Sequence, residues 1–130
     1  MDKWNVWPLK DVNGIKFGMK REEVRKVLGG EVSEFKKSKF SKTTTDNFGI
    51  CHVFYNMNDE CEAVEIFEGV TVDVNGKTIF PTDIESIKKV FGDIEEEYGS
   101  FISKSNSIGI YAPSGKMESI LFGNKGYYED

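Results

Sequence analysis

The sequence predicts an α+β domain in which two tandem repeats, each a helix followed by a β-hairpin, form one antiparallel sheet with both helices packed on one face. Three observations support this. A segment with helical periodicity recurs 63 positions later, a β-hairpin pattern recurs at a spacing of 56, and a third hairpin lies between the copies. We expect a single domain over residues 1–130, with repeat 1 at about 13–69, the connecting hairpin at about 70–80 and repeat 2 at about 80–124.

The repeated helix lies within residues 17–29 and again within residues 80–92. Both copies place apolar residues at the i, i+3, i+4 spacing of one helical face. These residues are Val24, Val27 and Leu28 in the first copy, and Ile87, Val90 and Phe91 in the second. Gly29 and Gly92 stand where a left-handed cap would end each helix. Thr82 or Asp83 can cap the start of the second helix.

The repeated hairpins turn at residues 58–60 and 114–116. If both turns are three-residue loops, Phe54 opposes Val64 and Ile110 opposes Ile120. One face then packs under the helices and the other meets water or a partner. The face expected under the helices carries Ile50, Phe54, Val64, Ile66, Ile108, Ile110, Ile120 and Phe122. The face expected to be open carries Val53, Tyr55, Ala63, Glu65, Phe67, Gly109, Tyr111, Ser119 and Leu121.

The remaining segments are less strongly patterned. Residues 70–80 read as a hairpin, because Asn75-Gly76 supplies the two positive φ angles of a type I′ turn. A strand beside the first helix is expected within residues 31–42. The first twelve residues predict no element, although Trp4 and Trp7 should pack against something.

Composition limits the class of protein. The chain has 130 residues, 38% of them apolar, and its ten Phe residues can fill a core. No apolar run approaches the roughly 20 residues that span a bilayer, and the N-terminus has no secretory signal pattern, so we expect a cytosolic protein. The net charge is −5, with the positive excess confined to residues 1–42. The acidic remainder would repel nucleic acid and attract a basic protein.

The sequence offers little for chemistry. It contains no nucleophile–base motif and no glycine-rich phosphate loop, so neither an enzyme nor a cofactor is expected. His52 is assigned to the margin of the core. Cys51, His52 and Cys61 could be imagined as metal ligands. The expected register, however, places Cys51 opposite Phe67 and on the other face from His52, which argues against both a metal site and a disulfide. The basic run at 36–42 is typical of a protected strand edge rather than a nucleic-acid site.

Partner binding is the better prediction. Tyr55 and Tyr111 hold equivalent positions on the expected open face, where an apolar ring with a polar tip suits a binding anchor. Two acidic groups could steer a basic partner, or could simply be solvated. The neighbouring anchors are Glu65, Phe67 and Leu121, and the acidic groups are Asp59 and Glu60 at the first hairpin tip and Glu95, Glu96 and Glu97 after the second helix. Alternatively, a loop, the Trp4/Trp7 segment or the 70–80 hairpin covers the tyrosines.

Residues 14–29, Gly-Ile-Lys-Phe-Gly-Met-Lys-Arg-Glu-Glu-Val-Arg-Lys-Val-Leu-Gly, resemble the opening of a known helix-plus-sheet module. The module occurs in tandem in the β-lactamase inhibitory protein and singly in small outer-membrane assembly lipoproteins. Similar small acidic proteins serve as immunity partners of bacterial toxins. The resemblance implies a curved sheet that grips another protein. It leads us to expect a cytosolic immunity protein that occludes a basic toxin domain such as a nuclease, in a contact-dependent or polymorphic toxin system. The alternatives are an assembly module of the lipoprotein type and a small ligand-binding domain or hydrolase.

Overall fold

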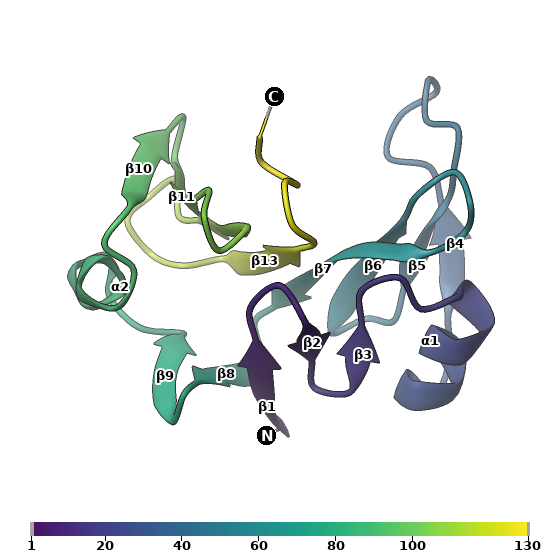
Figure 1. Ribbon diagram of the computed structural model, residues 1–130, viewed down its shortest axis with the longest axis horizontal. Helices are drawn as coiled ribbons and strands as arrows, with labels where there is room; N and C mark the ends of the chain where they lie inside the picture. Colours follow the sequence, from purple (N-terminus) through teal and green to yellow (C-terminus); the bar gives the residue numbers. More distant parts are fainter. Residues whose placement is uncertain (1, 130) are drawn as a thin grey trace.

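The computed structural model describes residues 2–129 and shows a mostly β protein (Figure 1). Strands hold 43% of the residues and helices 12%. The strands form two sheets, one of eight strands and one of five. The predicted fold class, two helix-plus-hairpin repeats in a single α+β sheet, is therefore wrong. The two helices are short, and a second sheet that the prediction did not contain closes the core.

The eight-stranded sheet is antiparallel throughout, with β7 and β13 at its centre. Each half of the sheet is a four-stranded meander that follows a short helix in the chain and includes one strand of this central pair. The strand expected within residues 31–42 is confirmed as β4 (Ser33–Phe35), whereas the prediction missed β5, β10 and β11, which are only three or four residues long and do not alternate between polar and apolar residues. In spatial order the strands are β10 (Ile94–Glu97), β11 (Ser100–Ser103), β12 (Ile108–Tyr111), β13 (Ser119–Gly123), β7 (Cys61–Phe67), β6 (Cys51–Tyr55), β5 (Thr45–Asn47) and β4 (Ser33–Phe35).

The five-stranded sheet joins the N-terminus to the middle of the chain. Its order is β3 (Ile15–Lys16), β2 (Asp11–Val12), β1 (Asp2–Trp7), β8 (Val70–Val74) and β9 (Lys77–Phe80). Strand β1 runs parallel to β8, which places Trp4 in the core and leaves Trp7 66% exposed. The predicted connecting hairpin is confirmed as β8–β9, since Asn75 and Gly76 have φ angles of 51° and 78°.

Two helices lie on the same side of the large sheet as the small sheet (Figure 1). Helix α1 (Arg21–Leu28) and helix α2 (Ile84–Val90) each bury one apolar residue completely, Val24 and Ile87. Asp83 caps α2 by accepting from the Ser86 amide at 2.7 Å. Gly29 has the expected positive φ of 63°. The left-handed cap expected at Gly92 is wrong, because α2 already ends at Phe91 in extended backbone.

The register of the large sheet is predicted correctly in one half only. Ile110 opposes Ile120 as expected. In the other half Phe54 opposes Ala63, and the pairing is irregular between Phe54 and Tyr55. Because a one-residue slip moves side chains to the other face, Val53 points into the core and Phe54 does not. Cys51 likewise opposes Ile66 rather than Phe67, and both cysteines are buried free thiols.

Candidate protein-binding site

The open face is the side of the large sheet turned away from the helices. Strand pairing aligns five of its residues in one row across β10, β11, β12, β13 and β7, which we call the open row: Glu97, Ser100, Tyr111, Ser119 and Phe67. Tyr111 is 45% exposed at the centre of this row. The Ser119 hydroxyl donates to Glu65 Oε2 at 2.7 Å and so fixes that carboxylate beside the row.

Most of the predicted anchors share this face. Glu65, Phe67, Tyr111 and Leu121 all project from it, because they alternate with the core residues of β7, β12 and β13. The acidic run is divided between the two faces. Along β10, the edge strand of the sheet, Glu95 and Glu97 project on the open face, while Glu96 aligns with the core position Phe101. The open face therefore carries two acidic side chains along one margin.

Tyr55 is not part of this site. Its side chain is 2% exposed, and its hydroxyl donates to Asp46 Oδ2 at 2.9 Å. The Arg21 guanidinium lies 4.1 Å from the ring centroid. Burial, together with the neighbouring Asp46 carboxylate, raises the pKa of Tyr55 well above its ordinary value. The expectation that Tyr55 is an exposed anchor is wrong, because the irregular pairing after Phe54 turns it into the core.

Asp46 is the centre of a buried ionic network. Its carboxylate is fully buried and accepts from Arg21 at 2.8 Å and from Arg25 at 2.6 Å, besides Tyr55. Burial by itself would raise the pKa of Asp46, but the hydrogen bonds from Arg25 and Tyr55 and the two arginine charges hold it below its usual value. Because the carboxylate is fully partnered, this network fixes α1 to β5 and β6 rather than offering a reactive group.

Asp59 and Glu60 lie away from the open row. Asp59 accepts from Arg21 Nε at 2.9 Å, and Glu60 accepts from the Asn56 amide at 3.1 Å while lying 4.0 Å from Lys20. Both precede the start of β7, whereas Phe67 ends that strand. The first hairpin tip therefore anchors the start of α1 and is separated from the acidic margin on β10.

The C-terminal segment, residues 124–129, covers part of the open face (Figure 1). A side chain on Gly109 would collide with the Tyr128 hydroxyl, and one on Gly123 would come within 2.5 Å of Tyr127 Cβ. Burial raises the pKa of Tyr127 to about 12. The segment thus covers the face around two glycines and leaves Tyr111 in the open row exposed. The sequence reasoning missed this contact, although two glycines within strands were its signal.

Tyr98 was not among the predicted site residues. It lies at the β10–β11 turn beside Glu97, is fully exposed and has a φ of 49°. An aromatic residue in the left-handed region costs roughly 1–2 kcal/mol. The Tyr98-Gly99 pair between two strands is the signal that could have located it, since such a turn needs two positive φ angles. A strained and exposed tyrosine next to the open row adds a second candidate anchor.

His52 contributes to packing on the open face. Its ring makes edge contacts with Phe35 and Phe67, at centroid distances of 4.9 and 4.7 Å. Burial lowers the pKa of His52, and the nearby Glu65 opposes that shift. The sequence placed His52 on the core face, and the register of β6 overturns that placement. The imidazole therefore supports Phe67 at the end of the open row.

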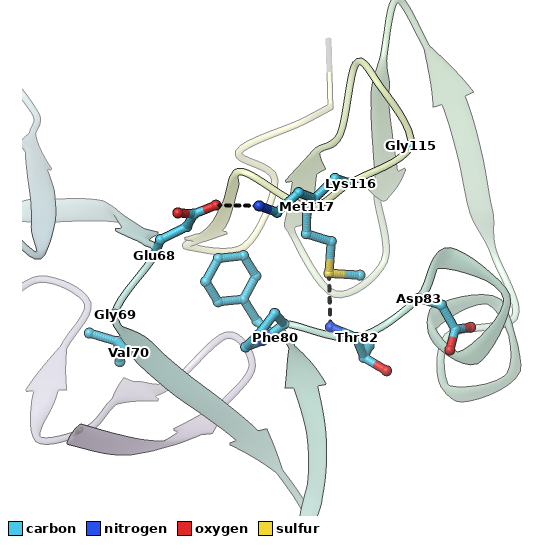
Figure 2. A pocket seen from close by; sticks show the side chains of 10 residues that line it. Glu68, Gly69, Val70, Phe80, Thr82, Asp83, Gly115, Lys116 and Met117 are labelled. Atoms are coloured by element: carbon cyan, nitrogen blue, oxygen red, sulfur yellow. Dashed lines mark hydrogen bonds and ion pairs between the residues drawn. The ribbon is translucent and has the colours of Figure 1, made fainter.

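A pocket of about 560 Å³ opens where the two sheets meet (Figure 2). Its walls come from the β7–β8 turn, the β9–α2 connection and the β12–β13 loop. Figure 2 shows the Phe80 ring and the Met117 side chain facing the interior, with an ion pair between Glu68 and Lys116 at 3.5 Å above them. The lining residues are Glu68, Gly69, Val70, Phe80, Pro81, Thr82, Asp83, Gly115, Lys116 and Met117.

Across residues 2–129, no group of three or more His, Cys, Asp or Glu side chains is placed to hold a metal ion. Over the same stretch, no helix has the length and apolar character to cross a membrane. Comparisons with family models, with curated proteins and with solved structures give no match to this chain.

Proposed function

We propose that this chain is a cytosolic immunity protein that binds a basic toxin domain through the open row and neutralises it by occlusion. The observation that carries the proposal is Tyr111, 45% exposed in a row that also presents Glu97 and Phe67. Binding energy concentrates at a few aromatic and arginine residues that are flanked by polar groups. The open row has two aromatic residues, Tyr111 and Phe67, beside polar side chains, and it contains no arginine.

Charge supports a basic partner. The chain carries 22 acidic and 17 basic residues, and Glu95 and Glu97 line the margin of the open face. Carboxylates at the edge of an interface raise the rate of encounter with a basic surface. A nuclease has such a surface because its substrate is a polyanion. An acidic inhibitor seated there excludes the nucleic acid by steric and electrostatic competition.

The inhibitor would act stoichiometrically and without catalysis. The open row presents side chains for contact, and the buried carboxylate of Asp46 is fully partnered in the core. Immunity of this kind needs complementarity to one partner only. Specificity would therefore come from shape around Tyr111 and Tyr98 and from charge along β10.

The test is co-expression with a candidate toxin domain, taken from the C-terminus of a large protein whose gene adjoins the one for this chain. We expect growth rescue and co-purification in a one-to-one ratio. Tyr111→Ala should reduce both, whereas Trp7→Ala, which alters an exposed aromatic residue on the other sheet, should not. Rescue that is equally strong with Tyr111→Ala would remove the open row from the interface.

A further inference from the structure

We propose that the pocket between the sheets takes one large apolar side chain from a partner segment in which basic residues flank that side chain. This inference deepens the proposed function and rests on it, since the partner is the protein that covers the open row. Four features of the pocket carry it: its position, its apolar floor, a weakly satisfied amide and the charges at its mouth.

The pocket adjoins one end of the open row along the chain. Phe67 is followed directly by Glu68 at the pocket wall. On the neighbouring strands, Tyr111 leads into the loop that supplies Gly115, Lys116 and Met117, and its carbonyl accepts from the Glu118 amide at 2.8 Å as the chain returns. A partner that covers the row at Phe67 therefore lies one residue along the chain from the pocket wall at Glu68.

The floor is apolar and firmly held. Val70, Phe80 and Met117 line it, and each is at most 3% exposed, so the floor belongs to the core and does not have to form on binding. A volume of about 560 Å³ lies within the roughly 300–1,000 Å³ range of preformed binding pockets. It accommodates a leucine or aromatic side chain together with the adjoining backbone.

The Thr82 amide supplies a directional contact. Its N–H donates to Met117 Sδ at 3.4 Å, and a thioether sulfur is a weak acceptor. Figure 2 shows this contact at the edge of the pocket. A backbone carbonyl of the partner segment would be a better acceptor, because an amide–carbonyl hydrogen bond is stronger than an amide–sulfur one. The bound segment would therefore be held by its backbone as well as by its side chain.

The charges at the mouth favour cations beside the anchor. Glu68 and Asp83 are acidic and Lys116 is the one basic residue of the lining; the Asp83 carboxylate is engaged in capping α2, which leaves Glu68 as the acceptor for a cation. Lys116 pairs with Glu68 at 3.5 Å, with both side chains well exposed at 79% and 65%. An ion pair that exposed contributes little, so it can open at small cost. A lysine or arginine of the partner could then form an ion pair with Glu68 in place of Lys116.

The probe is an acetylated and amidated pentapeptide, Gly-Lys-Leu-Lys-Gly, titrated into the full-length protein and followed by two-dimensional NMR. We expect saturable shifts at the pocket residues, with the Thr82 amide signal moving downfield as an oxygen replaces the sulfur. Replacing the peptide leucine by alanine should weaken binding about tenfold. Replacing both lysines by glutamate should weaken it about threefold or more at low salt.

Matched variants test the mouth. Glu68→Lys should weaken binding of the lysine peptide, whereas Glu22→Lys, the same change at an exposed position on α1, should not. Equal binding of the leucine and alanine peptides, or shifts only outside the pocket, would overturn the inference. Tighter binding of the glutamate peptide than of the lysine peptide would show that the pocket mouth prefers anionic neighbours, which would also overturn the inference. Saturation of the same signals by indole alone, as tightly as by a tryptophan version of the peptide, would identify a small-molecule site instead.

The two proposals fail separately. The peptide titration uses this protein alone, so it can succeed even when co-expression gives no rescue, and the proposed function then fails while the pocket remains a peptide site. Conversely, rescue that depends on Tyr111 but not on Glu68, with no peptide binding, overturns the pocket and leaves the open row as the interface.

Discussion

Tyr55 donates a 2.9 Å hydrogen bond to the carboxylate of Asp46 inside the core. Both residues are at most 2% exposed, and two arginines of α1 complete the partners of the carboxylate. The aromatic residue that the sequence suggested for binding is therefore part of what holds helix and sheet together. This relationship separates residues that matter for stability from those that matter for recognition.

Substitution of Tyr55 should affect stability and leave the binding surface intact. Tyr55→Phe keeps the ring and removes the hydroxyl, so one hydrogen bond to a charged group is lost. We expect the free energy of unfolding to fall by about 1.5–3 kcal/mol, measured by urea denaturation. The affinity of the folded variant for its partner should be unchanged. A partner affinity that drops while stability holds would place Tyr55 in the interface after all.

Acid should weaken the network at Asp46. The folded protein holds the pKa of Asp46 below its ordinary value of 3.8, so the ionised carboxylate stabilises the fold fully above that value. The contribution is lost as the pH falls below 3.8 through the folded-state pKa. Asp46→Asn should lower the free energy of unfolding by about 3–5 kcal/mol near neutral pH.

The measurement for Asp46 is urea denaturation of the wild type and the Asp46→Asn variant over a pH series. The difference between the two should stay constant from neutral pH down to about pH 5 and should narrow below 3.8. A difference of the same size at about pH 3 and at neutral pH would mean that the ionised form of Asp46 is not what stabilises the fold.

The two exposed tyrosines should be hot spots. Tyr111→Ala and Tyr98→Ala should each weaken partner binding by about 1–4 kcal/mol, measured by calorimetry with the purified partner domain. Their free energies of unfolding should change little, because Tyr111 and Tyr98 are exposed by 45% and 101%. Phe40→Ala, which removes an 81% exposed ring on the β4–β5 loop, is the matched control. Unchanged affinity in both tyrosine variants would exclude this end of the sheet from the interface with the partner.

The acidic margin of β10 offers an internal control. Glu95 and Glu97 project on the open face and Glu96 on the other. Replacing Glu95 and Glu97 with lysine reverses both charges and should slow association with the partner about tenfold or more at low salt. Added salt should reduce the difference in association rate between this variant and the wild type. Glu96→Lys should have a smaller effect on the association rate in stopped-flow measurements. Equal effects of lysine substitution at all three positions would show that the association rate depends only on the net charge of the protein.

Gly109 should be essential for seating the C-terminal segment. A methyl group there would meet the Tyr128 hydroxyl, so Gly109→Ala should displace residues 124–129 and expose them to chymotrypsin. We expect a loss of about 1–3 kcal/mol in the free energy of unfolding, typical of overpacking. Gly92→Ala is the control, because no atom lies within 4 Å of its added carbon and its φ is ordinary. Resistance of the Gly109 variant to cleavage would contradict the contact.

Local signals in the sequence predicted several elements correctly. The Asn75-Gly76 turn fixes the β8–β9 hairpin, since its backbone angles depend on those two residues alone. Asp83 caps α2 as one of the two candidates. The faces of β12 and β13 follow from strict alternation across a regular ladder. In each case a short stretch of chain contains the whole physical cause.

Errors arose where distant contacts decide the outcome. The irregular pairing at Phe54 and Tyr55 depends on the Arg21 and Asp46 partners of the tyrosine, which are far away in sequence. Strand β1 depends on parallel pairing with β8, and no local pattern in the first residues shows it. The outer strands of the large sheet owe their structure to neighbours already in place rather than to β propensity. Tyr111, on a regular ladder, lies on the open face as predicted, whereas Tyr55, at the irregular pairing, lies in the core.

The parallel pairing of β1 with β8 has a consequence for biosynthesis. Asp2 is synthesised long before its ladder partner Val70, which lies past the middle of the sequence. Until that stretch is translated, the leading strand can pair only with the short β2, and its other edge stays open to unrelated polypeptides. A stall in translation before Val70 would thus leave a nascent chain prone to aggregate, and chaperone dependence should be greatest during synthesis of the first half.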